Sequence, residues 1–147
     1  MKKILFLGLI TTGLMLGAHA QDKLKDKDVP ATIQTSFKTE FPNAKDIEWK
    51  MKDGKYKVEF EVNGLDHFAK YGTDGKLMAK GMKIRTSELP NAVATSVKNG
   101  HANRTIDDVY RVDKNGSAYY LVKLNGDPDT KVLYSADGQE VKEKTDH

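Results

Sequence analysis

The sequence predicts an α+β fold in which two tandem helix-plus-antiparallel-strand repeats form one continuous antiparallel sheet with both helices on one face. Three observations predict it. Two apolar helical stripes lie 60 residues apart, alternating strands follow each stripe, and matching Asn-Gly and Asp-Gly turns recur 62 or 63 residues later. One such repeat has a single short helix and too little apolar surface for a core of its own, so the two should share a sheet.

The first twenty residues carry the features of an export signal. Lys2 and Lys3 precede an apolar run from Ile4 to Leu16, and Ala18-His19-Ala20 is a small-x-small cleavage motif. We therefore expect a signal peptide over residues 1–20, with cleavage after Ala20. The run is shorter than the roughly 20 residues that a spanning helix needs, so we expect a periplasmic or secreted product without stable membrane insertion.

Composition excludes several classes of protein. Without Lys2 and Lys3, the 24 basic residues fall to 22 against 21 acidic ones, a net charge of +1 that gives no basis for nucleic-acid binding. The chain has no cysteine. A disulfide scaffold, thiol catalysis and cysteine-ligated metal sites are therefore excluded, and the core has to hold the fold without covalent cross-links.

The first repeat is predicted over residues 29–84, after a charged, flexible leader at residues 21–28. Asp28 is expected to cap its helix, and Pro42 to end it near Glu40 or Phe41. The helix itself is predicted from four apolar residues spaced four apart: Val29, Ile33, Phe37 and Phe41.

Four strands should follow this helix. Ile47, Trp49 and Met51 alternate with charged residues, Asp53-Gly54 makes a turn, and the alternation resumes from Tyr56 to Val62. A third strand is predicted over residues 66–71 and a weaker fourth over residues 76–84. The result is a sheet with one apolar and one charged face.

The second repeat, predicted over residues 85–142, follows the same plan. Ser87 is placed to cap a helix that Asn99-Gly100 closes. The helical stripe is Leu89, Val93 and Val97, and the first strand is expected to place Ile106, Asp108, Tyr110 and Val112 on one face. Further strands are predicted at residues 120–124 and 132–134, and residues 143–147 form a tail.

These motifs resemble a known family. The Val29-Pro30 and Leu89-Pro90 helix starts, the segment Phe41-Pro42-Asn43-Ala44, the strand and turn from Tyr56 to Gly64 and the Asp74-Gly75 turn are similar to those of exported PepSY-like, beta-lactamase-inhibitor-like proteins. The resemblance covers roughly residues 28–141. It implies tandem repeats similar in plan to beta-lactamase inhibitory protein, whose sheet presents a concave face to an enzyme, and kinship with modules that hold or inhibit peptidases.

No pattern of catalytic or ligating residues is evident. His67, His101 and His147 have no metal-ligand spacing, and no serine lies in a Gly-x-Ser-x-Gly motif. The loops at residues 113–116 and 127–129 lack the acidic spacing of a calcium loop. We therefore predict no catalytic residue, cofactor or metal, and a protein that is not an enzyme.

The candidate partner-binding face lies on the second hairpin. If Tyr120, Val122 and Leu124 face the helices, the residues between them face away and are exposed. Exposed apolar and aromatic residues are typical of recognition surfaces. The alternative is that a neighbouring strand partly covers these outward-facing residues. The candidates are Tyr119, Leu121 and Lys123, with Phe68, Lys57 and Glu59 from the first repeat.

The predicted function is that of an exported, non-enzymatic binding protein. It would recognise a protein or peptide of unknown identity through the exposed sheet face, and inhibition of a hydrolase or peptidase is one form of that role. The alternative is a periplasmic protein that binds a small ligand or a metal ion.

Overall fold

The computed structural model describes residues 22–142, and the predicted signal peptide and tail lie outside the described residues. The predicted α+β class, with two helices and one antiparallel sheet, is confirmed. The elements are β1 (Asp22–Leu24), η1 (Asp26–Asp28), α1 (Ala31–Glu40), β2 (Lys45–Lys52), β3 (Lys55–Val62), β4 (Leu65–Tyr71), β5 (Leu77–Ile84), η2 (Thr86–Glu88), α2 (Asn91–Gly100), β6 (Ile106–Lys114), β7 (Ser117–Leu124) and β8 (Thr130–Ser135).

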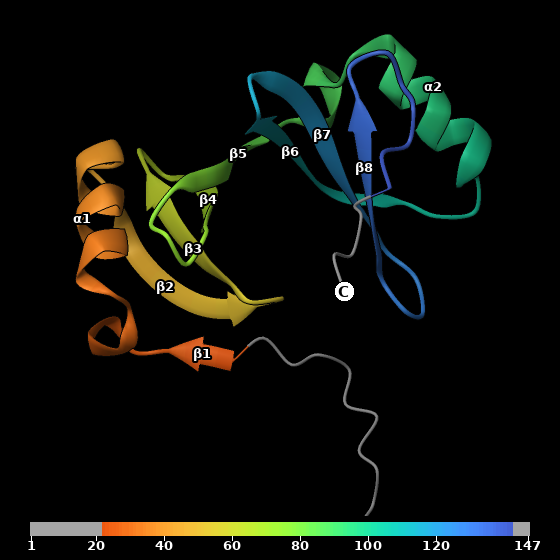
Figure 1. Cartoon of the computed structure of the whole chain (residues 1–147). Coiled ribbons are helices and arrows are strands. Elements are labelled where there is room, and N and C mark those ends of the chain that lie inside the picture. The colour runs from red at the N-terminus through yellow and green to blue at the C-terminus, as the bar shows by residue number, and fades with distance from the viewer. Residues whose placement is uncertain (1–21, 143–147) are drawn as a thin grey trace, which may run out of the picture.

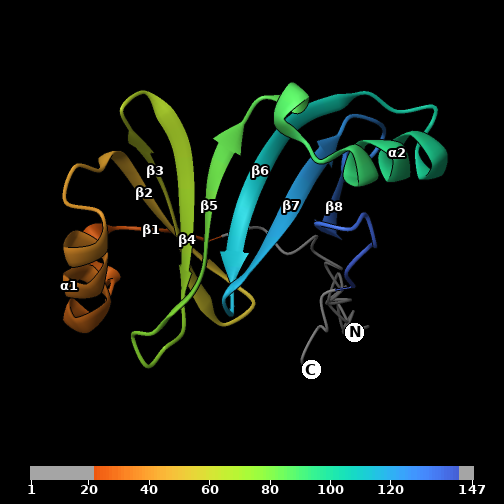
Figure 2. The ribbon, with the colours of Figure 1, turned by 90° about the horizontal axis from the view of Figure 1, so that it is seen from above.

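The eight strands form one sheet in sequence order, β1 to β8, and every neighbouring pair is antiparallel. Figure 1 shows the sheet as two limbs, β1–β4 and β6–β8, joined through β5, and Figure 2 shows the strands side by side from above. Three tight hairpins have positive φ at both turn residues, the geometry that Asn-Gly and Asp-Gly pairs favour: Asp53-Gly54, Asn63-Gly64 and Asn115-Gly116.

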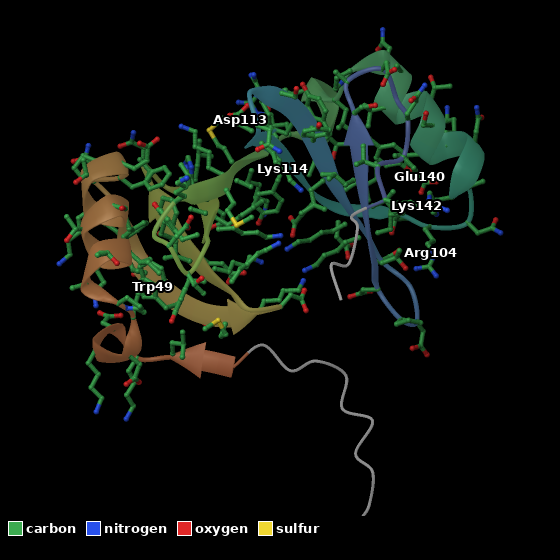
Figure 3. The ribbon with its side chains drawn as sticks, viewed as in Figure 1. Trp49, Arg104, Asp113, Lys114, Glu140 and Lys142 are labelled. Atoms are coloured by element: carbon green, nitrogen blue, oxygen red, sulfur yellow. The ribbon has the colours of Figure 1, made fainter. Side chains whose placement is uncertain are left out.

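Helix α1 packs on the first limb. Ile33 and Phe37 are buried, and Trp49 of β2 packs in the same cluster, on the side of the sheet that α1 covers (Figure 3). The predicted cap is wrong: Asp28 ends η1, and Pro30 precedes the helix with extended backbone and no capping side chain. The α1 cluster consists of Val29, Ile33, Phe37, Trp49, Val58, Phe60, Ala69 and Tyr71.

Helix α2 packs on the second limb in the same manner. Ser87 does not cap it, because Ser87 lies in η2, where the Arg85 N–H donates to Glu88 Oε2 over 2.7 Å, and Pro90 precedes the helix. The α2 cluster consists of Leu89, Val93, Val97, Val109, Val122, Leu124 and Tyr134.

Two β-bulges change the predicted facing of side chains. The register of β6 against β7 shifts between Ile106 and Asp108, so Val109 packs with α2 while Tyr110 and Val112 do not. The prediction that Ile106, Tyr110 and Val112 share a face is therefore wrong. A matching shift between Lys45 and Glu48 leaves Ile47 42% exposed, although it was predicted to alternate with Trp49 into the core.

Residues 22–28 are not a flexible leader as predicted. Asp22–Leu24 forms β1, which pairs with β2 through Leu24 opposite Trp49, and Asp26–Asp28 forms a 3-10 turn. Leu24 also packs against the α1 cluster. The segment is ordered because it completes the outer edge of β2 and covers part of the apolar core, two gains that a charged composition does not reveal.

A third cluster is built from strands and contains no described residue of α1 or α2. We call it the strand-only cluster: Phe68, Ala79, Tyr110, Val112 and Leu133, with Tyr119, Leu121 and Val141 partly buried against it. Phe68 lies directly opposite Gly81, and a Cβ atom at Gly81 would collide with the Phe68 ring. Glycine at this position therefore allows the ring to lie flat over β5.

Candidate functional site

A groove of about 350 Å³ lies beside the strand-only cluster. Six strands contribute to it, because the two limbs bend toward each other and bring β2 and β3 opposite β7 and β8 (Figure 1). Figure 3 shows side chains filling much of the space between the limbs. The lining residues are Asp46, Glu48, Lys57, Glu59, Phe60, Glu61, Asp66, His67, Phe68, Tyr110, Leu121, Lys123 and Lys131.

Five of the six residues predicted for the partner-binding face line this groove, and Tyr119 packs beside it against the strand-only cluster. Phe68, predicted to be exposed, is only 7% exposed. The prediction of its exposure was wrong because Gly81 leaves space for the ring and Tyr110 packs against it, with 5.6 Å between ring centroids. The apolar residues thus form the floor of the groove and the charged ones its walls.

Several lining residues were missed. Tyr110 was assigned to the wrong face because the bulge in β6 is invisible in the alternation pattern. Lys131 lies directly opposite Lys123 on β8, and its alternation with Val132 could have shown that the two lysines share a face. The bend that brings both close to β3 depends on the whole sheet.

Lysines form one end of the groove, which we call the basic end: Lys57, Lys123 and Lys131. The Lys57 ammonium lies 5.4 Å from the centre of the Phe68 ring, and the Lys123 ammonium lies 5.1 Å from that of Tyr110. These cation–π contacts hold two ammonium groups over the aromatic floor.

Glu59 is held by two lysines of the first limb. Its two oxygens lie 3.0 Å from Lys50 Nζ and 3.1 Å from Lys57 Nζ. Burial alone would raise the pKa of the Glu59 carboxyl, but the hydrogen bonds and charges of these lysines outweigh it and lower that pKa. Burial lowers the pKa of the Lys57 ammonium, although Glu59 opposes the shift.

Lys131 has the largest shift among the groove lysines. Although its side chain is exposed, partial burial of the ammonium in the concave wall lowers its pKa to about 8, and the charges of Lys57, Lys123 and Lys52 add to the effect. Three lysines of both limbs therefore lie close enough to act on this ammonium, and the charge of Glu59 opposes them.

Three further carboxylates line the groove: Asp46, Glu61 and Asp66. A hydrogen bond and charge repulsion from Asp46 raise the pKa of the exposed Glu61 carboxyl, and Asp66 adds to the repulsion. His67 stacks on Phe60 of the α1 cluster at 5.5 Å between ring centroids, and burial lowers the pKa of the imidazole. The groove therefore combines walls of both charges with an apolar floor.

A second hollow of about 570 Å³ lies at the start of α1. Its walls come from one continuous segment between Lys27 and Lys38, and Val29 is its only buried lining residue. No distant strand contributes to it, so we place the candidate site in the groove. Residues 22–142 contain no group of three or more His, Asp or Glu side chains positioned for a metal ion, and no helix suited to crossing a bilayer.

The pKa of Lys131 predicts a change of stability with pH. Between about pH 8 and 10.5 the unfolded chain binds more protons at this lysine than the folded chain, so folding stability should rise with pH across that window, and the cost of the charged lysine is complete below it. Lys131→Gln should therefore be more stable than the parent protein at pH 7, by at most about 1 kcal/mol because solvent screens an exposed group.

Urea unfolding of both proteins at pH 7 and pH 10 measures this difference. The advantage of Lys131→Gln should shrink as the pH rises, whereas Lys25→Gln reports the general effect of losing one exposed ammonium. An advantage that is the same at both pH values would show that Lys131 is not destabilised by its charge.

Comparison with known proteins identifies the family. The family described as "Putative beta-lactamase-inhibitor-like, PepSY-like" matches the chain twice, over residues 18–78 and 54–141. The chain belongs to the PepSY-like family. The resemblance inferred from its helix starts and turns is confirmed, and none of the curated proteins compared matches the chain.

Solved structures share the fold of this PepSY-like chain. A DUF2874 family protein of Bacteroides uniformis has 18% identity and a TM-score of 0.65, over 78% of this chain and 87% of its own. A protein of Bacteroides eggerthii, described among "putative periplasmic proteins", has 18% identity and a TM-score of 0.66, over 78% and 86%. A BLIP-like protein of Bacteroides fragilis has 22% identity and a TM-score of 0.58, over 78% and 84%.

Proposed function

We propose that this PepSY-like protein is an exported, non-enzymatic binding protein that recognises a protein or peptide through the groove. The observation that carries the proposal is the groove itself, in which six strands bring an aromatic floor together with walls of both charges. An apolar centre with a charged rim is the usual anatomy of a recognition surface. The face bound would include Lys57, Glu59, Leu121 and Lys123, with Phe68 and Tyr119 supporting it from below.

The proposal includes a duplicated architecture. Residues 29–84 and 85–142 would be two copies of one unit, with both helices on the same side of the sheet and the groove on the other. Equivalent details support this: Tyr71 and Tyr134 are both buried with hydroxyls that lack a hydrogen-bond partner among the described residues, and Gly75 and Gly138 both have positive φ beside a helix. The pairing of Ile84 with Val109 carries one apolar face from β5 into β6.

The relatives support the proposed class of function and location. The family and the Bacteroides fragilis structure are both described by likeness to a beta-lactamase inhibitor, so inhibition of a hydrolase or peptidase is the form of binding that we propose first. The description of the Bacteroides eggerthii protein as periplasmic supports a periplasmic location, in agreement with the predicted signal peptide. In such a role the groove would hold a loop of the partner and block access to its active site.

Site-specific photo-cross-linking in intact cells tests the proposal. A photoreactive phenylalanine analogue is placed either at Asp66 or at Leu121, two groove positions that lie on opposite limbs. Both positions should cross-link to the same protein, because a partner seated between the limbs touches both walls. The cross-linked species are identified by mass spectrometry.

The matched control is the same analogue at Thr95, an exposed position on α2. It should give no cross-link to that protein. Cross-links from Thr95 alone, or none from either groove position, would contradict binding through the groove.

A further inference from the structure

The basic end of the groove holds two ammonium groups without an anionic partner. In the part of the chain that the structure describes, no Asp or Glu forms an ion pair with Lys123 or Lys131. The two lysines lie directly opposite each other on β7 and β8. Like charges at such cross-strand positions destabilise a sheet.

The nearby carboxylates are already engaged elsewhere. Asp108, which lies across from Lys123 on β6, forms an ion pair of 2.8 Å with Lys83. Glu59 is bound by Lys50 and Lys57. Neutralisation of Lys123 or Lys131 by Asp108 or Glu59 would therefore require breaking an existing ion pair.

The surroundings of these lysines favour an anion that brings an apolar group with it. Tyr110 lies under the Lys123 ammonium, and Leu121 lines the same wall two residues before it. Ion pairs gain strength where apolar neighbours displace water, because the effective dielectric constant falls. An aliphatic carboxylic side chain with an apolar neighbour matches both features.

The carboxylates of the groove restrict the kind of anion. Asp46, Glu61 and Asp66 line the same groove, where a hydrogen bond and charge repulsion from Asp46 raise the pKa of Glu61. A polyanion lying along the groove would meet these carboxylates. A polypeptide segment that presents one or two acidic residues to the basic end would not.

We propose that the basic end binds the carboxylate of an Asp or Glu in the partner's segment, between Lys123 and Lys131, while an adjacent apolar side chain of that segment rests on Leu121 and Tyr110. This inference depends on the proposed function, because it names the chemistry of the partner that the groove recognises. The carboxylate takes the position of the anion that the lysine pair lacks, and relieves the repulsion between the two ammonium groups.

Two capped peptides test the inference on the full-length mature protein. Acetyl-Gly-Glu-Leu-Glu-Gly-amide carries the proposed chemistry, and acetyl-Gly-Gln-Leu-Gln-Gly-amide has the same shape without charge. NMR titration at low salt, observed at the lysine side chains, should show saturable shifts at Lys123 and Lys131 with the Glu peptide. The Gln peptide should bind at least roughly fivefold more weakly, as expected for the loss of a partly desolvated ion pair.

Variants assign the effect to the two lysines. Lys123→Gln with Lys131→Gln should reduce affinity for the Glu peptide roughly tenfold. Lys25→Gln, which removes an exposed lysine outside the groove, should leave the affinity unchanged. Circular dichroism of each variant separates loss of binding from loss of fold.

The remaining outcomes each decide the inference. Equal binding of the Glu and Gln peptides, or an affinity for the Glu peptide that survives the double substitution, would overturn it. Inorganic phosphate that produces the same shifts with equal or higher affinity would also overturn it, because the site would then be a general anion site. None of these results affects the cross-linking test of protein binding. If instead the Glu peptide binds selectively but the groove positions give no cross-link, the proposed function is overturned and the carboxylate site stands.

Discussion

Replacing Phe37 by alanine is expected to lower the free energy of unfolding by about 3–5 kcal/mol. The ring is 2% exposed and makes edge-on contacts with Trp49, at 5.3 Å and 75°, and with Phe60, at 5.0 Å and 76°. Phe37 therefore contacts residues of both β2 and β3. Its removal leaves a cavity between a helix and a sheet that the closely packed neighbours cannot fill without shifting.

Urea unfolding followed by circular dichroism measures this loss. The matched control is Phe41→Ala, because Phe41 belongs to the same group of rings, at 5.6 Å from Phe37 and 4.6 Å from Phe60, but is only partly buried. That substitution should cost clearly less. A loss for Phe37→Ala no larger than for Phe41→Ala would show that the α1 cluster does not depend on the central ring.

The second large effect is expected at Gly138, where alanine should cost about 2–4 kcal/mol. Gly138 has φ of 87°, in the region that side chains disfavour, and a Cβ atom there would lie 2.5 Å from the carbonyl oxygen of Ala92 and 2.8 Å from Ser96 Oγ. The Ser96 hydroxyl also donates to the Gly138 carbonyl over 2.6 Å. The substitution would therefore push the turn after β8 away from α2.

Gly75 supplies the control from the first half of the chain. Its φ is 84°, but a Cβ atom there would meet nothing closer than Thr32 at 3.8 Å. Gly75→Ala should therefore carry only the backbone penalty, about 1–2 kcal/mol. Thermal unfolding of the two variants compares them directly, and equal losses would mean that the close approach of α2 to Gly138 does not contribute.

The comparison of these two glycines also illustrates how the halves differ in detail. The atoms nearest to a Cβ at Gly75 belong to the Thr32 side chain, whereas the nearest atom at Gly138 is the Ala92 carbonyl oxygen, so α2 lies closer to its turn than α1 does. The two helices thus have different packing distances to their turns, because each helix packs against its own set of side chains.

Local patterns were sufficient for the elements of the fold. The apolar residues spaced four apart gave both helices, with α1 ending at Glu40 as Pro42 requires, and the Asp53-Gly54 and Asn63-Gly64 pairs gave hairpin turns. Asn125-Gly126, predicted to match Asn63-Gly64, instead opens a longer loop between β7 and β8. Helix caps were predicted less well. Asp28 and Ser87 have the right chemistry for caps, but Pro30 and Pro90 hold the residues before each helix in an extended conformation, so neither side chain reaches the helix.

The candidate site was accessible to sequence reasoning in part. Alternation along β7 indicated that Leu121 and Lys123 share a surface, and both line the groove. Tyr110 was missed because one extra residue in a bulge reverses the facing of the residues that follow it. Phe68 was expected to be exposed because the sequence does not show which residue lies opposite it. That residue is Gly81, whose missing side chain leaves space for the Phe68 ring.

Short-range patterns in the amino-acid sequence therefore predict both helices, most of the strands and several turns of this protein, since each depends on residues a few positions apart. The groove depends on contacts across the whole chain: two bulges, one glycine under Phe68, and a bend that brings Lys57 of β3 close enough to Lys131 of β8 for their charges to interact. Twist and curvature accumulate over all the strands of a sheet, and no single stretch of sequence encodes their sum. The charge of the groove is for that reason a property of the folded molecule.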